Sequence, residues 1–180
     1  MLKKLFLLGL MLSVTLTHAR VNDMFAEEKE ENLRYNTTIR AFMKNNEKIT
    51  DLVHNAYAHV VFPTIFKGGA VLGYAWGDGR AYYRGGMWTA NVRMTQYTIG
   101  AQLGGSAYSE IIFFKTREAF EAFKKGGLED STQLSLVPLY SGLSADVNFD
   151  DDVLVYTSSK GGLMLEATTG LQSFEYLQKK

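Results

Sequence analysis

The sequence predicts an α+β protein in which N-terminal helices pack on a twisted, barrel-like and mostly antiparallel β-sheet. Three observations support this class. The 180 residues include 17 glycines and 13% aromatic residues, which favour strands and turns over a helical bundle. Apolar residues recur at helical spacing before residue 60 and at every second position after it. With 46% apolar and 21% charged residues, the composition is that of a folded domain and excludes a mostly disordered chain.

Residues 1–19 have the pattern of a cleaved secretory signal peptide. Lys3 and Lys4 precede an apolar run over 5–16, and Thr17-His18-Ala19 places small residues at the cleavage point. The run has about 12 residues, too few to span a bilayer. A retained N-terminal anchor is the alternative. We therefore expect a periplasmic or secreted protein, with no lipobox cysteine and no transmembrane helix in the mature chain.

Two helices are expected before the sheet. Residues 20–48 form a charged segment with one weak apolar stripe, and 49–60 place apolar residues three and four apart. Asn46 or Thr50 could cap the second helix. Pro63 is expected to end it, because proline cannot donate a hydrogen bond within a helix. Without a linker later in the chain, residues 49–180 are expected to form a single domain.

The strands show period-two alternation. On 95–104 we expect one face to be buried and the other to be more accessible; the first holds Tyr97, Ile99, Ala101 and Leu103, and the second includes Gln96 and Gln102. On 71–76 the large residues Leu72, Tyr74 and Trp76 alternate with Val71, Gly73 and Ala75. The small face predicts that another backbone or a helix packs against it.

The rest of the chain predicts further strands and one short helix. Residues 111–114 are apolar on both faces, as in a central strand, and 153–156 and 163–167 are expected to be strands. Between them, 116–125 read as a helix with Thr116 as its N-cap and Gly126 as its C-cap.

Five Gly-Gly pairs are interpreted as tight turns, because glycine adopts positive φ at little cost. Four of the pairs follow a basic residue, namely Lys67, Arg84, Lys125 and Lys160. Such residues can simply be solvated turn positions. If three of the turns share one end of the sheet, however, they could hold an anionic lipid headgroup. The residues of this candidate site are Lys67, Gly68, Gly69, Arg84, Gly85, Gly86, Lys160 and Gly161.

Aromatic residues lie between these turns, at Tyr74, Trp76, Tyr82, Tyr83 and Trp88. We expect most of them in the core. Tryptophan also favours the membrane interface, where one end of the ring stays wet. Trp76 and Trp88 are therefore the candidates for a lipid-facing rim.

Motifs for catalysis, metals and cofactors are missing from the sequence. There is no phosphate-binding loop, no hydrolase nucleophile elbow and no cysteine. His54 and His59 would lie about 140° apart on the expected helix, which favours surface or packing roles. The acidic stretch 146–152 begins like a calcium loop, but Asp151 replaces the required glycine and Thr157 the required glutamate, which leaves weak calcium binding as the minor alternative. We expect no enzyme and no cofactor, and the zero net charge argues against nucleic-acid binding by bulk charge.

Three segments, in order, resemble the SYLF domain family. They are Ala58-His59-Val60-Val61-Phe62-Pro63 with Lys67-Gly68-Gly69, then Ile99-Gly100-Ala101-Gln102-Leu103-Gly104-Gly105, and finally Tyr156-Thr157-Ser158-Ser159-Lys160-Gly161. The resemblance covers roughly residues 50–170. It implies a compact α+β domain, phosphoinositide binding as in eukaryotic members, and lipid binding as described for exported bacterial members. The glutamate-rich 20–48 segment departs from a membrane-inserting helix, and export would remove actin as a partner.

Together these observations predict an exported, non-enzymatic protein that contacts anionic phospholipid headgroups through basic Gly-Gly turns. One alternative is a periplasmic scaffold or envelope-stress protein that binds another protein through the 22–46 helix. The second alternative is a hydrolase with an unrecognised site.

Overall fold

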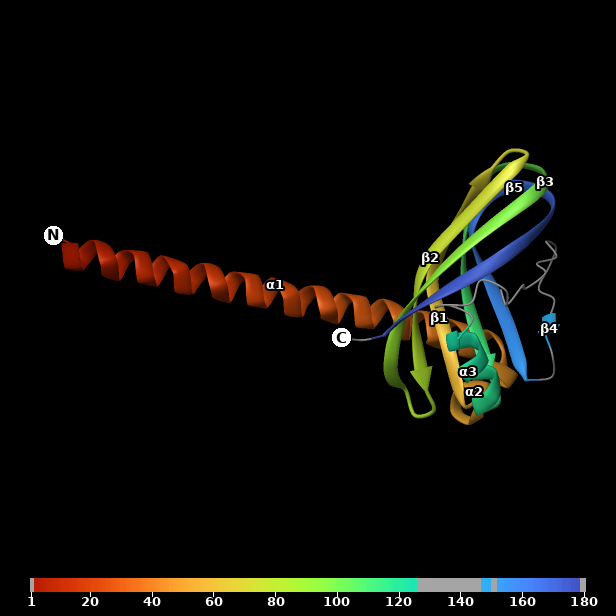
Figure 1. The fold of residues 1–180 in the computed structure, drawn as a ribbon, viewed down its shortest axis with the longest axis horizontal. Coiled ribbons are helices and arrows are strands. Elements are labelled where there is room, and N and C mark those ends of the chain that lie inside the picture. Colours follow the sequence, from red (N-terminus) through yellow and green to blue (C-terminus); the bar gives the residue numbers. More distant parts are fainter. Residues whose placement is uncertain (1, 126–146, 150–151, 179–180) are drawn as a thin grey trace. The chain divides into compact units, whose positions relative to one another are not determined.

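The computed structural model describes residues 2–125, 147–149 and 152–178, without the side chains of 2–19, 21–22, 45, 98–103, 147–149, 161–172 and 178. The chain divides into two compact units, Met1–Thr37 and Thr38–Lys180. The first unit is helical throughout its described part and belongs to α1, Leu2–Asn45. The second unit holds the end of α1, two short helices and the whole sheet (Figure 1). Of the described helices, none has the length and apolar content needed to cross a membrane.

The second helix, α2, spans Glu47–Asn55, and its start follows the expected capping. Asn46 is the N-cap, and its Oδ1 accepts a hydrogen bond from the backbone N–H of Lys48 at 3.0 Å. This satisfies one of the N–H groups that a helix start leaves unpaired. The prediction of Asn46 as a cap is confirmed.

The predicted end of this helix at Pro63 is wrong. The chain leaves the helix at Asn55 and begins β1, Ala58–Gly69, so Pro63 lies within a buried strand. The register of β1 shifts between Phe62 and Ile65, and such an irregularity accommodates a residue without an N–H group. The Pro63 carbonyl accepts a hydrogen bond from Ser109 Oγ at 2.9 Å. The apolar residues of 56–60 therefore follow the end of α2 and begin β1. Their spacing alone fits a helix as well as a strand.

Five antiparallel strands form one sheet in the order β1-β2-β3-β5-β4, with β1 also paired to β3. The other strands are β2 (Leu72–Tyr83), β3 (Met87–Phe114), β4 (Val147–Phe149) and β5 (Val153–Gln178). The first part of β3 pairs with β2 and its last part with β1, while β5 follows β3 along both parts. The α+β class with helices and a mostly antiparallel sheet is confirmed. Across the described residues the sheet is coiled but not closed into a barrel.

Three of the Gly-Gly pairs lie within strands and are not turns; the first, Gly68-Gly69, ends β1 just before the bend at Ala70 and Val71. Gly104-Gly105 lies in β3 and Gly161-Gly162 in β5. Gly104 has φ +121°, a conformation that side chains disfavour, at the position beside Gly69 where β3 joins the end of β1. Glycine there allows one strand to change partner without interruption. By contrast, Gly85 and Gly86 do form the β2–β3 turn, with φ values of +85° and +80°.

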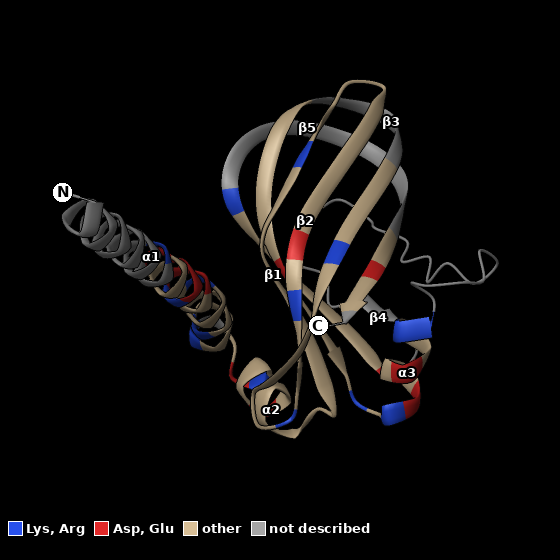
Figure 2. Ribbon diagram, turned by 60° about the vertical axis from the view of Figure 1, so that its left-hand side comes forward, with Lys and Arg blue, Asp and Glu red and all other residues tan. Residues whose placement is uncertain are grey.

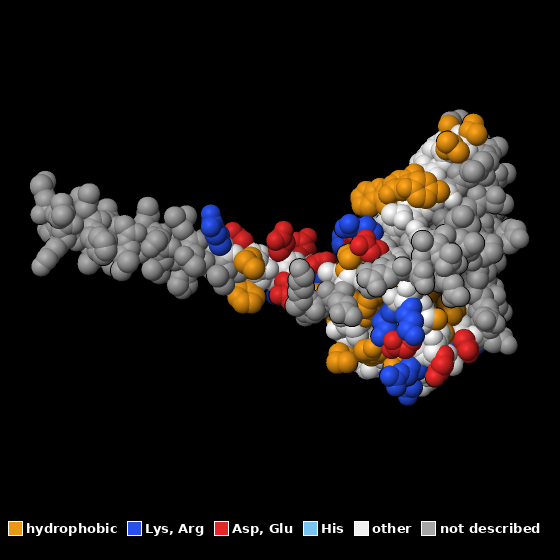
Figure 3. Space-filling view, viewed as in Figure 1, with side chains coloured by type: hydrophobic (Ala, Val, Ile, Leu, Met, Phe, Trp, Pro, Cys, Tyr) orange, Lys and Arg blue, Asp and Glu red, His pale blue; other side chains and the backbone are white. Residues whose placement is uncertain are grey.

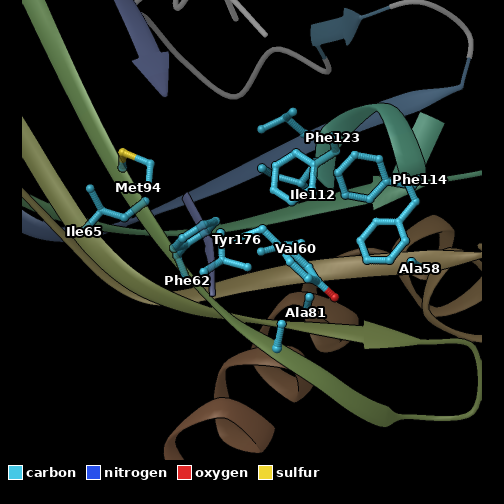
Figure 4. Packing of buried hydrophobic residues seen from close by; sticks show 14 of the residues in the cluster. Ala58, Val60, Phe62, Ile65, Ala81, Met94, Ile112, Phe114, Phe123 and Tyr176 are labelled. Atoms are coloured by element: carbon cyan, nitrogen blue, oxygen red, sulfur yellow. The ribbon is translucent and has the colours of Figure 1, made fainter. Parts of the chain in front are cut away.

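We call the sheet face that carries the hydrophobic core the inner face. The core joins residues from β1, β2, β3 and β5 with α3, Arg117–Lys125 (Figure 4). Its buried members are Ala58, Val60, Phe62, Ile65, Ala75, Ala81, Ala90, Val92, Met94, Ile112, Phe114, Phe120, Phe123, Val155 and Tyr176. Thr116 Oγ1 accepts a hydrogen bond from the N–H of Ala119 at 3.3 Å, which confirms the predicted cap of α3. α2 and α3 lie on opposite sides of the strands (Figures 2 and 4).

Glycines of β2 make room for the core. A Cβ atom at Gly79 would lie 2.5 Å from the Phe62 ring and 2.8 Å from the Val61 carbonyl oxygen. One at Gly77 would lie 2.8 Å from the Thr64 carbonyl oxygen and from a side-chain carbon of Ile65. The small face of β2 therefore packs closely against β1, so its glycines face inward.

The predicted facing of the strand over 95–104 is wrong where it can be observed. Gln96 is fully buried and Tyr97 is 65% exposed, which reverses the expected faces. The inner side of this strand continues from Val92 and Met94, both buried, to Gln96. Gln96 is tolerated inside because its Oε1 accepts a hydrogen bond from the Tyr108 hydroxyl at 3.2 Å. The side chains of Ile99, Ala101, Gln102 and Leu103 lie outside the described residues.

Candidate functional site

Exposed apolar side chains gather at one end of the outer face, around the turn that joins β1 to β2 (Figure 3). We call this set the apolar patch. Its members are 42–70% exposed, and they are Phe66, Val71, Leu72, Tyr74, Trp76 and Tyr97. Exposed large apolar residues that are clustered, unlike single ones, mark interaction surfaces.

Cross-strand pairing holds the aromatic members of the patch in rows. Phe66 of β1 is directly opposite Trp76 of β2, with ring centroids 5.2 Å apart. Tyr74 of β2 is directly opposite Tyr97 of β3, also at 5.2 Å. Such pairs contribute a few tenths to about 1 kcal/mol each to sheet stability. The rings are therefore held in place on the sheet while about half of their area remains accessible.

The β1–β2 turn forms the tip of the patch. Gly69 pairs with Gly73, and the N–H of Ala70 donates to the Leu72 carbonyl oxygen at 3.3 Å. Val71 and Leu72 are the most exposed members of the patch, at 69% and 70%. The ten residues from 68 to 77 contain no charged side chain.

A row of charged residues borders the patch on the same face. Asp78, Arg93 and Glu175 are successive cross-strand neighbours on β2, β3 and β5, and all three are exposed. Arg93 Nε donates to Asp78 Oδ1 at 3.0 Å. This hydrogen bond, together with the negative charges of Asp78 and Glu175, raises the pKa of Arg93. We call these three residues the charged row.

Beyond the charged row the outer face is buried rather than exposed. His59, Arg80 and Tyr82 are all below 9% exposed. The His59 ring stacks on Tyr82 with centroids 5.3 Å apart and also contacts Phe113 at 5.9 Å. Burial lowers the pKa of His59 from 6.5 to about 4, because the protonated ring would lose its hydration.

The two histidines do not share a helix, so the expected geometry of 140° is wrong. His54 is exposed at the end of α2, with its Nδ1 2.6 Å from the Thr50 carbonyl oxygen, whereas His59 is in β1. The expectation that they have surface and packing roles is confirmed, with His54 at the surface and His59 packed in the interior.

The structure separates the basic residues of the predicted headgroup site. Arg84 with Gly85 and Gly86 is at the β2–β3 turn, where its N–H donates to the Tyr57 carbonyl oxygen. Lys67 with Gly68 and Gly69 is at the far end of the same two strands, nine residues along β1, or about 30 Å away. Arg84 therefore does not converge with Lys67.

Lys67 and Lys160 flank the same stretch of β3. Lys67 is opposite Ser106, and the β5 segment next to Lys160 pairs with Ser106 and Tyr108. Lys160 is exposed and its Nζ donates to Thr64 Oγ1 at 3.0 Å. Lys67 is half-buried, and its partner Ala75 belongs to the core, so Lys67 lies on the inner side of the sheet. Lys160-Gly161 is part of β5 and is not a turn.

The two tryptophans differ in their surroundings. Trp76 is 47% exposed in the apolar patch, whereas Trp88 is half-buried with the Arg80 guanidinium carbon 4.0 Å from its ring centroid. The expectation that most aromatics of this region are core holds for Tyr82, which is buried, and is wrong for Tyr74 and Trp76. Both side chains point outward from β2, where they alternate with the glycines and the alanine that face inward.

The sequence signal that could have located the patch is the alternation of β2. Gly73, Ala75, Gly77 and Gly79 occupy one face, and the core fits only against a face that small. The large residues opposite them must then point outward. Tyr97 was missed because it was placed on the strand face that was expected to be buried.

The residues described by the structure do not gather three or more histidine, aspartate or glutamate side chains as a metal site would. Asp146, Asp150 and Asp151 of the calcium-loop candidate lie outside the described residues. Val147–Phe149 form β4, and Thr157 lies in β5. Asp152 Oδ2 accepts a hydrogen bond from Thr116 Oγ1 at 3.4 Å, beside the start of α3. Gly126 and Gly127 also lie outside the described residues.

In comparisons with known proteins, no family model, no curated protein and no solved structure matches the chain.

Proposed function

We propose that this is an exported, non-enzymatic protein that binds phospholipid membranes through the apolar patch. The observation that supports the proposal is the cluster of six exposed apolar residues around the β1–β2 turn. Three of the six are Tyr or Trp, the residues that favour the boundary between water and lipid. The SYLF resemblance agrees with lipid binding, although the basic Gly-Gly pattern of the sequence suggested charged turns as the contact.

Apolar contact is expected to exceed charge in this interaction. Each basic residue near an anionic bilayer contributes about 1 kcal/mol, and Arg84 is too distant from Lys67 and Lys160 to join them. Full burial of one large apolar side chain contributes about 1.5–3 kcal/mol. If three aromatic rings each bury about half of their area in lipid, they contribute about 2–4 kcal/mol, at least as much as the about 2 kcal/mol from two lysines.

Cosedimentation with phospholipid vesicles tests the proposal, using the protein as recovered after export. We expect the parent protein in the pellet, and a variant with Tyr74→Ser, Trp76→Ser and Tyr97→Ser in the supernatant. The matched control replaces Met24, Phe25 and Leu33 with serine, because these α1 residues are 62–68% exposed and lie outside the patch. Thermal unfolding of each variant checks that the sheet is folded.

Two outcomes would contradict the proposal. One is a parent protein that stays in the supernatant with both zwitterionic and anionic vesicles. The other is equal loss of binding from the patch variant and the α1 control. A protein partner for the patch would be indicated by the first outcome together with capture of a specific envelope protein that the patch variant no longer captures.

Charge and export are tested separately. Replacing Lys67 and Lys160 with glutamine should weaken binding to anionic vesicles by about 2 kcal/mol at most and leave binding to zwitterionic vesicles unchanged.

Mass spectrometry of the exported protein should find the mature N-terminus at Arg20 or within a few residues of it. Recovery with Met1 intact would refute cleavage.

A further inference from the structure

The apolar patch is graded in polarity along the strands. Val71 and Leu72 at the tip are aliphatic, Tyr74 and Tyr97 form the next row, and the following row is Phe66 and Trp76, with Thr95 beside Trp76. Thr95 Oγ1 and Ser173 Oγ lie 2.9 Å apart and continue that row. The charged row of Asp78, Arg93 and Glu175 comes next. From the tip inward, the aliphatic tip is thus followed by an aromatic row, then by a row of aromatic and hydroxyl groups, and then by the charged row.

This order is the order of environments across one leaflet of a bilayer. Hydrocarbon takes aliphatic side chains, the interface takes Tyr and Trp, and charges remain in water. A patch for a protein partner would instead be expected to have an apolar centre surrounded by a polar rim. Resting on the proposed function, we infer that the β1–β2 turn inserts tip-first into the hydrocarbon layer and that the charged row limits the depth of insertion.

Strand dimensions agree with this depth. Leu72 and Trp76 are four residues apart on β2, which is about 13 Å along an extended strand, and Leu72 and Asp78 are six apart, which is about 20 Å. The polar interface of one leaflet is about 5–7 Å thick, and half of the hydrocarbon layer is about 15 Å. A tip that enters the outer hydrocarbon therefore leaves Trp76 in the headgroup region and the charged row in water.

The turn itself is suited to an apolar environment. Backbone groups in lipid need internal partners, and the tip supplies the Gly69–Gly73 pair and the bond from Ala70 N–H to the Leu72 carbonyl. No charge has to be buried, because residues 68–77 carry none. Figure 3 shows the apolar side chains of the tip and of the rows below it on one side of the sheet, with charged side chains beyond them.

The natural chain has no cysteine, so single labels can be placed without removing native thiols. The variants Leu72→Cys, Glu175→Cys and Met87→Cys each receive an environment-sensitive fluorophore. They probe the tip of the patch, the charged row, and the start of β3 beside the β2–β3 turn. Vesicles contain phospholipids that carry a quencher deep in the acyl chain. Cosedimentation in the same samples measures how much protein is bound.

We expect the label at Leu72 to shift its emission to the blue and to be quenched, and the labels at Glu175 and Met87 to do neither. Intrinsic fluorescence supplies a label-free arm. A Trp88→Phe variant reports Trp76, which should be quenched by lipids brominated near the headgroup, and a Trp76→Phe variant reports Trp88, which should not.

The outcomes separate this inference from the proposed function. Protein that pellets with vesicles while the Leu72 label stays in water and unquenched overturns the insertion and leaves membrane binding intact. Equal quenching at Leu72 and Glu175 overturns the depth limit. Failure to pellet overturns both. A blue shift at Leu72 that appears without vesicles and grows with protein concentration would assign the tip to a second copy of the chain and overturn the insertion.

Discussion

The two ends of the outer sheet face are both rich in aromatic residues, but only one is buried. At the end nearest the β2–β3 turn, His59, Tyr82 and Phe113 are almost inaccessible, and the His59 ring stacks on Tyr82 and contacts Phe113. At the end nearest the β1–β2 turn, Tyr74 and Trp76 are 42% and 47% exposed. The charged row of Asp78, Arg93 and Glu175 separates the two regions (Figure 2).

This difference shows that an apolar strand residue does not by itself identify the buried face. At the buried end both faces of β1 are covered, so both faces are apolar for the same reason. At the exposed end the inner face of β2 is made of glycine and alanine, and the large residues of that strand point away from it. The exposed apolar residues therefore need an explanation beyond stability, and the proposed membrane contact would supply one.

The largest expected effect concerns the two faces of β3. Met94→Asp should lower the free energy of unfolding by about 4 kcal/mol or more, because Met94 is fully buried and the carboxylate would lose its hydration. Tyr97→Asp should cost less than about 1 kcal/mol, since Tyr97 is mostly exposed. Denaturant unfolding measures both. Equal losses would restore the facing first expected from the sequence.

The next effect is the response of the buried end to acid. The pKa of His59 is about 4 in the folded protein and 6.5 when the chain is unfolded, so the unfolded state binds the proton more readily. Above pH 6.5 both states are neutral and His59 has no effect. Between pH 6.5 and pH 4 it should lower the free energy of unfolding by about 3 kcal/mol.

A His59→Phe variant should lose that part of the pH dependence, while His54→Ala, at an exposed position, should retain it. Chemical unfolding at pH 7 and at pH 4 gives the difference for each protein. A parent and a His59→Phe variant with the same pH dependence would show that the ring titrates normally in the folded state.

The sequence predicted most of the helices and strands, but not which faces of the strands are buried. The cap at Asn46, the helix after Thr116 and the central strand at 111–114 follow from local chemistry, and the structure agrees with all three. The end of α2 was misplaced because apolar spacing over 56–60 fits a helix and a strand equally. Pro63 was misread because a bulge can accept proline within a strand.

The sequence predicted the candidate site only in part, because it does not show which residues strand pairing brings close together. Basic Gly-Gly pairs are visible in the sequence, but whether they share one end of the sheet depends on strand pairing. Arg84 and Lys67 fall at opposite ends of the β1–β2 hairpin, and Gly161 falls inside a strand. Trp76 was a candidate from its residue type alone, whereas its neighbours in the patch required the register of three strands.

A smaller effect tests the close packing that turns the aromatic residues outward. Gly79→Ala should lower the free energy of unfolding by about 2 kcal/mol, because its Cβ would lie 2.5 Å from the Phe62 ring and 2.8 Å from a backbone oxygen. Gly105→Ala is the control, since its nearest neighbour would be 3.6 Å away, an ordinary contact. Thermal unfolding compares the two. If the variants are equally stable, the small face of β2 is not what directs Tyr74 and Trp76 outward.

The smallest effect concerns the coupling of Tyr74 and Tyr97, and it separates the stability of the patch from its binding. Their rings are 5.2 Å apart on paired strands, and an exposed cross-strand aromatic pair contributes about 0.5 kcal/mol beyond the single residues. A double-mutant cycle with Tyr74→Ser and Tyr97→Ser should therefore give a coupling of about 0.5 kcal/mol in unfolding. On the proposed function, the same variants should weaken membrane binding by more than this, because both rings would lose their contact with lipid. A coupling near zero would mean that the strands do not hold the rings together, and a loss of stability larger than the loss of binding would make the patch a structural feature of the sheet.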